Sequence, residues 1–323
     1  MTRAALDPAF AEAVAEIEAL GVPEWHALAT ADARRVEDEL FSTDAHLPVA
    51  RATDLGFDGP GGRVPVRVYR PEETPAPTLV FYHGGGWQLG TLDSADGICR
   101  RLCRRLGAVV VSVDYRLAPE HPFPAAVADA VAAVEWVDGV VADLGGDGSV
   151  GVAGTSAGGN LAAAVALAAA ADRPLGFDLD VDLAVQALFY PMLAPGFDGD
   201  SRQEHADGPL LTVRDVREFW RTYLANPADA ANPYAVPLQA DERVLSSVAP
   251  AVVAVGSHDP LRSEAVAYAR RLRAAGVAVD ETVAEGLPHG FVSFADDASE
   301  EETGVPAAER ASDAVLADVD ARL

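Results

Sequence analysis

Three side chains with complementary chemistry follow one another along the chain in the order serine, aspartate, histidine. They are Ser156, Asp259 and His289. A serine hydroxyl is a weak nucleophile until a base accepts its proton, and the base needs an acid that orients it. The order therefore predicts nucleophilic catalysis by Ser156, with His289 as base and Asp259 as orienting acid. Glu264 and Glu285 are the alternative acids.

The surroundings of Ser156 fit a nucleophile. Apolar residues 149–153 precede the segment Gly154-Thr155-Ser156-Ala157-Gly158, and an alanine-rich helical pattern follows it. A sharp strand-to-helix turn leaves no room for side chains two positions before and after the serine, which explains Gly154 and Gly158. The helix N-terminus also places partial positive charge where an oxyanion would form.

A second glycine-rich segment, His83-Gly84-Gly85-Gly86-Trp87, follows a short apolar run over residues 78–82. Backbone N–H groups without neighbouring side chains can closely approach an oxygen that gains negative charge. We expect this segment to stabilise an oxyanion; the alternative is a glycine-rich turn without a chemical role.

The elements that must position these residues alternate between strands and helices. After an N-terminal helical pair over residues 6–41, strands are expected at 64–69, 78–82, 108–113, 149–153, 184–190, 251–255 and 277–283. Helices are expected at 92–106, 125–141, 157–171 and 263–275. Apolar strands separated by helices predict an α/β fold whose mostly parallel central sheet carries helices on both faces. Asp259 and His289 each follow a strand, so they should lie at the same sheet edge as Ser156.

These segments, together with residues 114–125 (Asp-Tyr-Arg-Leu-Ala-Pro-Glu-His-Pro-Phe-Pro-Ala), resemble the hormone-sensitive-lipase-like branch of the α/β-hydrolase fold. The resemblance runs from about Val64 to the C-terminus. It implies a serine carboxylesterase that uses neither a metal nor an organic cofactor.

By position, the resemblance assigns the nucleophile to Ser156, the base and later acid to His289, and the orienting acid to Asp259. The N–H donors of the oxyanion hole would be Gly84, Gly85 and Ala157, while the His83 side chain would brace the loop. Two residues depart from the family pattern, Thr155 and Ser263, where aspartate is common. Neither position has a role in the triad.

The family also carries a helical cap, which here would come from two parts of the chain. We expect residues 1–50 and the insertion 195–248 to form the cap, and residues 51–194 and 249–323 to form the core. The predicted pocket residues are Trp87, Leu210, Phe219, Trp220 and Phe291. Such a pocket favours short- to medium-chain esters. An amidase, deacetylase or lactonase with the same triad is the alternative, as is a non-catalytic ligand receptor.

The composition limits the partners. The 24 basic residues are all arginine and face 50 acidic ones, a net charge of −26 that disfavours nucleic acid and anionic membranes. Such a balance is typical of salt-adapted proteins, although a GC-rich genome would also favour it. Cys99 and Cys103 are expected to be buried free thiols. The longest apolar run is too short for a membrane span, and the acidic N-terminus predicts a cytoplasmic protein. A homodimer formed through a sheet edge would be compatible with the fold, but no residue argues for it.

Overall fold

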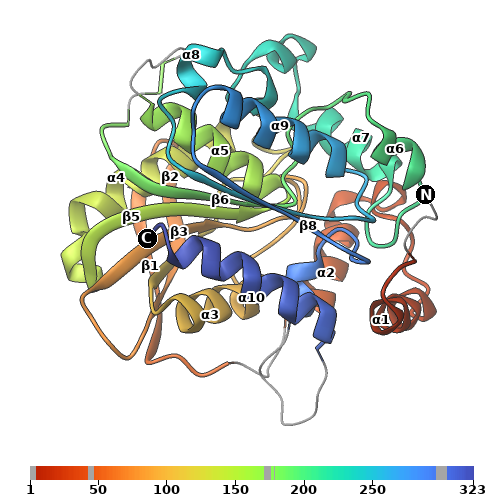
Figure 1. The fold of residues 1–323 in the computed structure, drawn as a ribbon, viewed down its shortest axis with the longest axis horizontal. Coiled ribbons are helices and arrows are strands. Elements are labelled where there is room, and N and C mark those ends of the chain that lie inside the picture. The colour runs from red at the N-terminus through yellow and green to blue at the C-terminus, as the bar shows by residue number, and fades with distance from the viewer. Residues whose placement is uncertain (1–4, 43–46, 171–175, 178, 296–303) are drawn as a thin grey trace.

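An eight-stranded sheet forms the centre of the molecule, with the strand order β1-β2-β4-β3-β5-β6-β7-β8 (Figure 1). The computed structural model describes residues 5–42, 47–170, 176–177, 179–295 and 304–323. The strands are β1 (Arg51–Gly59), β2 (Gly62–Arg70), β3 (Ala76–Tyr82), β4 (Val109–Val113), β5 (Gly146–Thr155), β6 (Leu183–Phe189), β7 (Ala251–Gly256) and β8 (Val279–Ala284).

The sheet is parallel from β4 to β8 and antiparallel at one edge. The β1–β2 and β2–β4 pairs are antiparallel, whereas β3, β4, β5, β6, β7 and β8 run in one direction. Strands β4 and β7 are buried along their whole length, as expected for strands covered on both faces. The predicted mostly parallel sheet is thus confirmed.

Helices cover both faces of the sheet, as predicted. In Figure 1, α3 (Asp96–Leu106) and α10 (Pro306–Asp320) lie on one side, and α4 (Ala125–Leu144), α5 (Ala157–Ala169) and α9 (Arg262–Ala274) lie on the other. Residue 171, where the helix predicted at residues 157–171 would end, lies outside the described residues. Cys99 and Cys103 on α3 are buried free thiols, which confirms that prediction.

The N-terminus and the segment between β6 and β7 supply further elements: α1 (Pro8–Ala19), η1 (Trp25–Ala27), α2 (Thr30–Phe41), α6 (Asp200–Glu204), α7 (Val213–Tyr223), η2 (Pro227–Ala231), η3 (Pro237–Gln239) and α8 (Glu242–Leu245). Of these, α1, α2, α6 and α7 lie together at the end of the sheet where the parallel strands finish, whereas α8 lies apart from them (Figure 1). Residues 1–4 and 43–46 of the predicted N-terminal cap part lie outside the described residues. Within the described ranges, no helix is both long and apolar enough to cross a bilayer.

Candidate active site

Ser156 lies at a strained turn between β5 and α5. Its φ of 53° and ψ of −114° place an L-residue in a rarely populated backbone region. A Cβ atom at Gly154 would overlap the carbonyl of Gly158, and one at Gly158 would overlap the backbone of Tyr82. The turn therefore excludes side chains at both glycine positions, for the steric reason expected from the sequence.

A continuous row of hydrogen bonds joins Ser156, His289 and Asp259. His289 Nε2 lies 3.0 Å from Ser156 Oγ, and His289 Nδ1 lies 2.8 Å from Asp259 Oδ2. Because an ionised carboxylate can only accept, Nδ1 donates to Asp259 and leaves Nε2 to accept the serine proton. This arrangement can turn the Ser156 hydroxyl into a nucleophile.

The acid in this row is firmly held. Asp259 is fully buried, and its second oxygen, Oδ1, accepts a hydrogen bond of 2.7 Å from the N–H of Leu261. Glu264, an alternative acid, instead accepts hydrogen bonds from the N–H groups of Leu193 and Ala194 and pairs with Arg202 at 2.6 Å.

Burial raises the pKa of Glu264, against the attraction of Arg202. The other alternative acid, Glu285, is exposed. Asp259 is thus the residue of the three that the fold places against the imidazole.

The glycine-rich segment lies beside Ser156 at the end of β3. Gly85 and Gly86 have φ values of 99° and 59°, which glycine adopts without strain. Within the described part of the chain, the N–H groups of Gly84 and Gly85 have no hydrogen-bond acceptor. Ala157 is the first residue of α5, so its N–H lacks an acceptor within the helix. These three donors can receive an oxyanion formed at Ser156.

His83 holds this segment from beneath. Its ring is buried, stacks on Tyr115 at 4.3 Å, and donates from Nδ1 to the carbonyl oxygen of Gly84 at 2.8 Å. The Tyr115 hydroxyl donates to the carbonyl oxygen of His83 at 2.8 Å. Burial lowers the pKa of His83 to about 4, so the ring is neutral at pH 7 and suited to bracing the loop.

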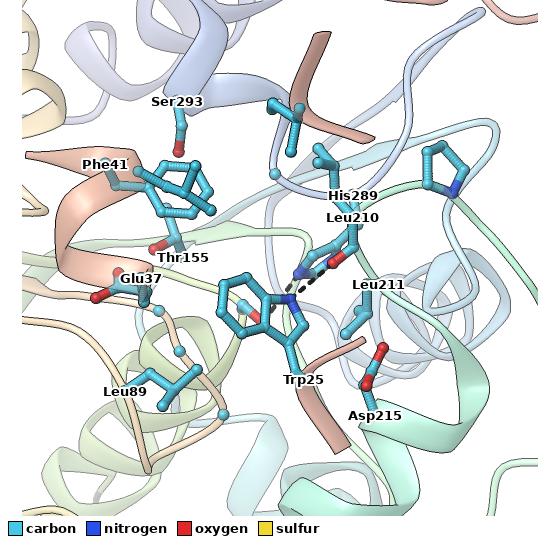
Figure 2. Close-up of a pocket in the computed structure, with 18 of the residues that line it drawn as sticks. Trp25, Glu37, Phe41, Leu89, Thr155, Leu210, Leu211, Asp215, His289 and Ser293 are labelled. Atoms are coloured by element: carbon cyan, nitrogen blue, oxygen red, sulfur yellow. Dashed lines mark hydrogen bonds between the residues drawn. The ribbon is translucent and has the colours of Figure 1, made fainter. Parts of the chain in front are cut away.

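A cavity of about 330 Å³ opens over Ser156 and His289 (Figure 2). Leu210 and Phe219, both predicted pocket residues, line it. Trp25, Leu89 and Leu211 add apolar surface that the sequence analysis did not predict.

The other three predicted pocket residues lie behind the cavity wall. Trp87 is fully buried, stacks flat on Tyr223 at 4.0 Å and contacts Trp220 at 4.6 Å. Phe291 is also fully buried and packs against Tyr190 at 5.5 Å. The expectation that Trp87, Trp220 and Phe291 face the pocket is corrected: these rings pack in the hydrophobic core behind it.

Tyr190 is a cavity residue that the sequence analysis missed. It follows β6 with a φ of 40°, and its ring packs edge-on against His289 at 4.7 Å. Its position at the carboxyl end of a predicted strand was the available signal, because that edge also carries the three reactive residues. Tyr190 can hold the imidazole in the plane needed to reach Ser156.

The N-terminal segment and the insertion meet over the cavity. Trp25 Nε1 donates to the carbonyl oxygen of Leu210 at 3.1 Å, and Leu210 itself has a φ of 67°. The backbone N–H of His26 donates to Asp215 Oδ1 at 2.8 Å. Asp215 is buried and completes the capping box of α7 with Thr212. These contacts fix the position of Leu210 in the cavity wall.

The two departures from the family pattern have local roles. Thr155 lines the cavity next to Ser156. The Ser263 N–H donates to Ser201 Oγ at 3.0 Å, while the N–H of Ser201 donates to Ser263 Oγ at 3.2 Å. Ser263 therefore joins α9 to α6, the first helix of the insertion. Neither residue belongs to the hydrogen-bonded row.

Across the described ranges, no three histidine, cysteine, aspartate or glutamate side chains are grouped in a way that could hold a metal ion.

Comparison with known proteins agrees with this fold. The family described as alpha/beta hydrolase fold matches residues 79–293. Carboxylic ester hydrolase LipN of Mycobacterium tuberculosis is 43% identical over 81% of this chain and 73% of its own length. Ethyl acetate hydrolase of Pseudomonas putida is 36% identical over 87% of this chain and 88% of its own.

A solved structure resembles the whole molecule. The hyperthermophilic esterase from the archaeon Pyrobaculum calidifontis superposes with a TM-score of 0.87 and is 37% identical, covering 98% of both chains. The chain belongs to the α/β-hydrolase family, in its hormone-sensitive-lipase-like branch.

Proposed function

We propose that this protein is a serine carboxylesterase that forms an acyl-enzyme on Ser156. The observation that carries the proposal is the Ser156–His289–Asp259 row at the base of the cavity, with His289 Nε2 3.0 Å from Ser156 Oγ. The names of the relatives, carboxylic ester hydrolase and ethyl acetate hydrolase, support the same chemistry.

In the proposed reaction, Ser156 Oγ attacks the ester carbonyl carbon while His289 accepts the hydroxyl proton. The carbonyl oxygen becomes negative and binds the N–H groups of Gly84, Gly85 and Ala157. The carbon–oxygen bond to the alcohol then breaks, and His289 returns its proton to the departing oxygen. Water, deprotonated by His289, attacks the acyl group and releases the acid with free Ser156.

The size and lining of the cavity support short- to medium-chain substrates. A volume of about 330 Å³ lies at the low end of the range for small-molecule sites, and its walls include Leu210, Leu211 and Phe219. We propose that residues 1–50 and 195–248 form a cap over this cavity, which the contact of Trp25 with Leu210 supports. The cytoplasmic location and the homodimer stay predictions.

Hydrolysis of p-nitrophenyl acetate, butyrate, octanoate and palmitate by wild type, S156A and S247A tests the proposal. Ser247 is an exposed serine, so S247A controls for loss of a hydroxyl. We expect wild type and S247A to prefer the shorter esters and S156A to lose at least about 10⁴-fold in kcat. Folded wild type that hydrolyses none of the four esters would contradict the proposal and favour an amide or lactone substrate.

A further inference from the structure

Glu37 is a buried carboxyl group in the cavity that the proposed reaction does not use. It lies on α2, lines the cavity, and is only 9% exposed. Its Oε2 atom has no hydrogen-bond partner among the described residues. Figure 2 shows Glu37 on the side of the pocket opposite Leu210 and Leu211. A buried polar atom without a partner is costly, and a bound ligand can supply the missing bond.

The groups around Glu37 leave its charge uncompensated. Burial raises its pKa to about 7, and the neighbouring Asp38 carboxylate adds to this, while hydrogen bonds from Ser94 and Gly90 oppose it. The nearby Tyr115 hydroxyl supplies no positive charge, since a protonated phenol is neutral, and burial keeps it protonated by raising its pKa well above the ordinary value. Arg34, also on α2, is engaged with Glu120 at 2.7 Å.

The rest of the cavity lining is also acidic, which favours a positively charged ligand. Four more carboxyl groups line it, those of Glu18, Glu24, Asp207 and Asp215, together with the imidazoles of His83 and His289. The described lining includes neither arginine nor lysine. Asp215 already receives hydrogen bonds from Thr212 and His26, so it is less available to a ligand than Glu37.

We propose that Glu37 binds an ammonium group of the substrate, so that the enzyme selects esters that carry a protonated amine over neutral esters of the same shape. This inference rests on the proposed esterase function. The ammonium N–H donates to the carboxylate, and the two charges compensate each other within the cavity. A neutral ester leaves the carboxyl group without that partner.

Two pairs of substrates of matched shape test the inference. In the first, 2-(dimethylamino)ethyl butyrate is compared with 3-methylbutyl butyrate, which places the amine in the alcohol part. In the second, ethyl 4-(dimethylamino)butanoate is compared with ethyl 5-methylhexanoate, which places it in the acyl part. The measured quantity is the ratio of kcat/KM within each pair, from pH 5.5 to 7.5. The pH dependence of kcat/KM that arises from His289 is the same for both members of a pair, so it cancels in the ratio.

For wild type we expect a ratio of about ten or more in favour of the ammonium ester at pH 7.5, in at least one pair. The ratio should fall towards pH 5.5, as Glu37 becomes protonated. In E37Q this ratio should be about tenfold lower than in wild type and should no longer depend on pH. E39Q is the matched control, since Glu39 is an exposed residue of the same helix that pairs with Arg35, and it should keep the wild-type ratio.

A wild-type ratio near one in both pairs overturns the inference while leaving the esterase function intact, and needs no variant. A high ratio that E37Q retains also overturns it, because the other carboxylates would then select the cation. Failure to hydrolyse any of the four esters contradicts the proposed function itself. The pair that shows the preference identifies which part of the substrate lies beside Glu37.

Discussion

At the scale of single residues, the site combines a strained nucleophile with firmly held partners. Both carboxylate oxygens of Asp259 accept hydrogen bonds, one from His289 and one from the N–H of Leu261. The turn that gives Ser156 its positive φ is sterically possible because neither Gly154 nor Gly158 carries a side chain. Strain of this kind costs of the order of 1–3 kcal/mol and persists where the surrounding structure holds it. The serine oxygen is therefore held in position before substrate arrives.

Glu37 gives a prediction about stability and pH. Its pKa is raised by burial from 4.5 to about 7, so the folded state binds a proton that the unfolded state has lost between these values. The contribution of Glu37 to the free energy of unfolding is therefore most favourable below about pH 4.5 and falls as the pH rises through 7. Above pH 7, ionised Glu37 destabilises the folded state by up to about 3 kcal/mol.

E37Q removes that penalty, because a glutamine carries no charge. We expect E37Q to melt at a higher temperature than wild type at pH 8 and at nearly the same temperature at pH 5, as measured by calorimetry. E39Q, which alters an exposed carboxylate, should show little difference at either pH. An equal difference between E37Q and wild type at both pH values would contradict the raised pKa.

The sequence alone was enough to predict the hydrogen-bonded row of three reactive residues, but not which residues line the cavity. Ser156, Asp259 and His289 were recognisable because each follows a strand and together they have complementary chemistry. Trp87, Trp220 and Phe291 were misplaced because large apolar rings suit a core and a pocket equally well. Glu37 was missed since it is one of 50 acidic residues, and only its burial distinguishes it.

At the scale of elements, the β5–α5 turn has the tightest packing requirement around the site. G158A would drive a methyl group into the backbone of Tyr82 at the end of β3. We expect it to displace Ser156 and lower kcat/KM by about 10²-fold or more, with a lower melting temperature.

G139A is the matched control, because a Cβ atom at this exposed glycine of α4 meets nothing within 4 Å. It should keep full activity and gain up to about 1 kcal/mol of stability from helix propensity. Wild-type activity in G158A would contradict the account of the turn.

Most elements could be predicted because their apolar periodicity is strong. Among the strands, the exception is β1, which the sequence analysis did not predict. Only Phe57 of its nine residues is buried, so this edge strand lacks the apolar pattern of the central strands. Its signal was the turn Gly59-Pro60-Gly61-Gly62, which joins it to β2 as a hairpin.

At the scale of the whole molecule, charge is the dominant feature. With 50 acidic and 24 basic residues, many carboxylates have no arginine available to them, so their mutual repulsion opposes folding. Added salt screens exposed charges, with a Debye length of about 3 Å at 1 M. We expect the melting temperature at pH 7.5 to rise steadily from low to molar KCl.

The same titration at pH 5 is the control, because the pH is then close to the sequence pI of about 4.4 and repulsion is weaker. The rise should be smaller there. A flat or falling melting temperature at pH 7.5 would show that the acidic composition is not an adaptation to salt.

The central claim, that Ser156 is the nucleophile, is tested most directly by covalent labelling. The protein is treated with a fluorophosphonate, digested, and the modified residue is located by tandem mass spectrometry. We predict one phosphonyl group per chain on Ser156, with loss of esterase activity in parallel. Modification of a different residue, or full inactivation with Ser156 unmodified, would contradict the account.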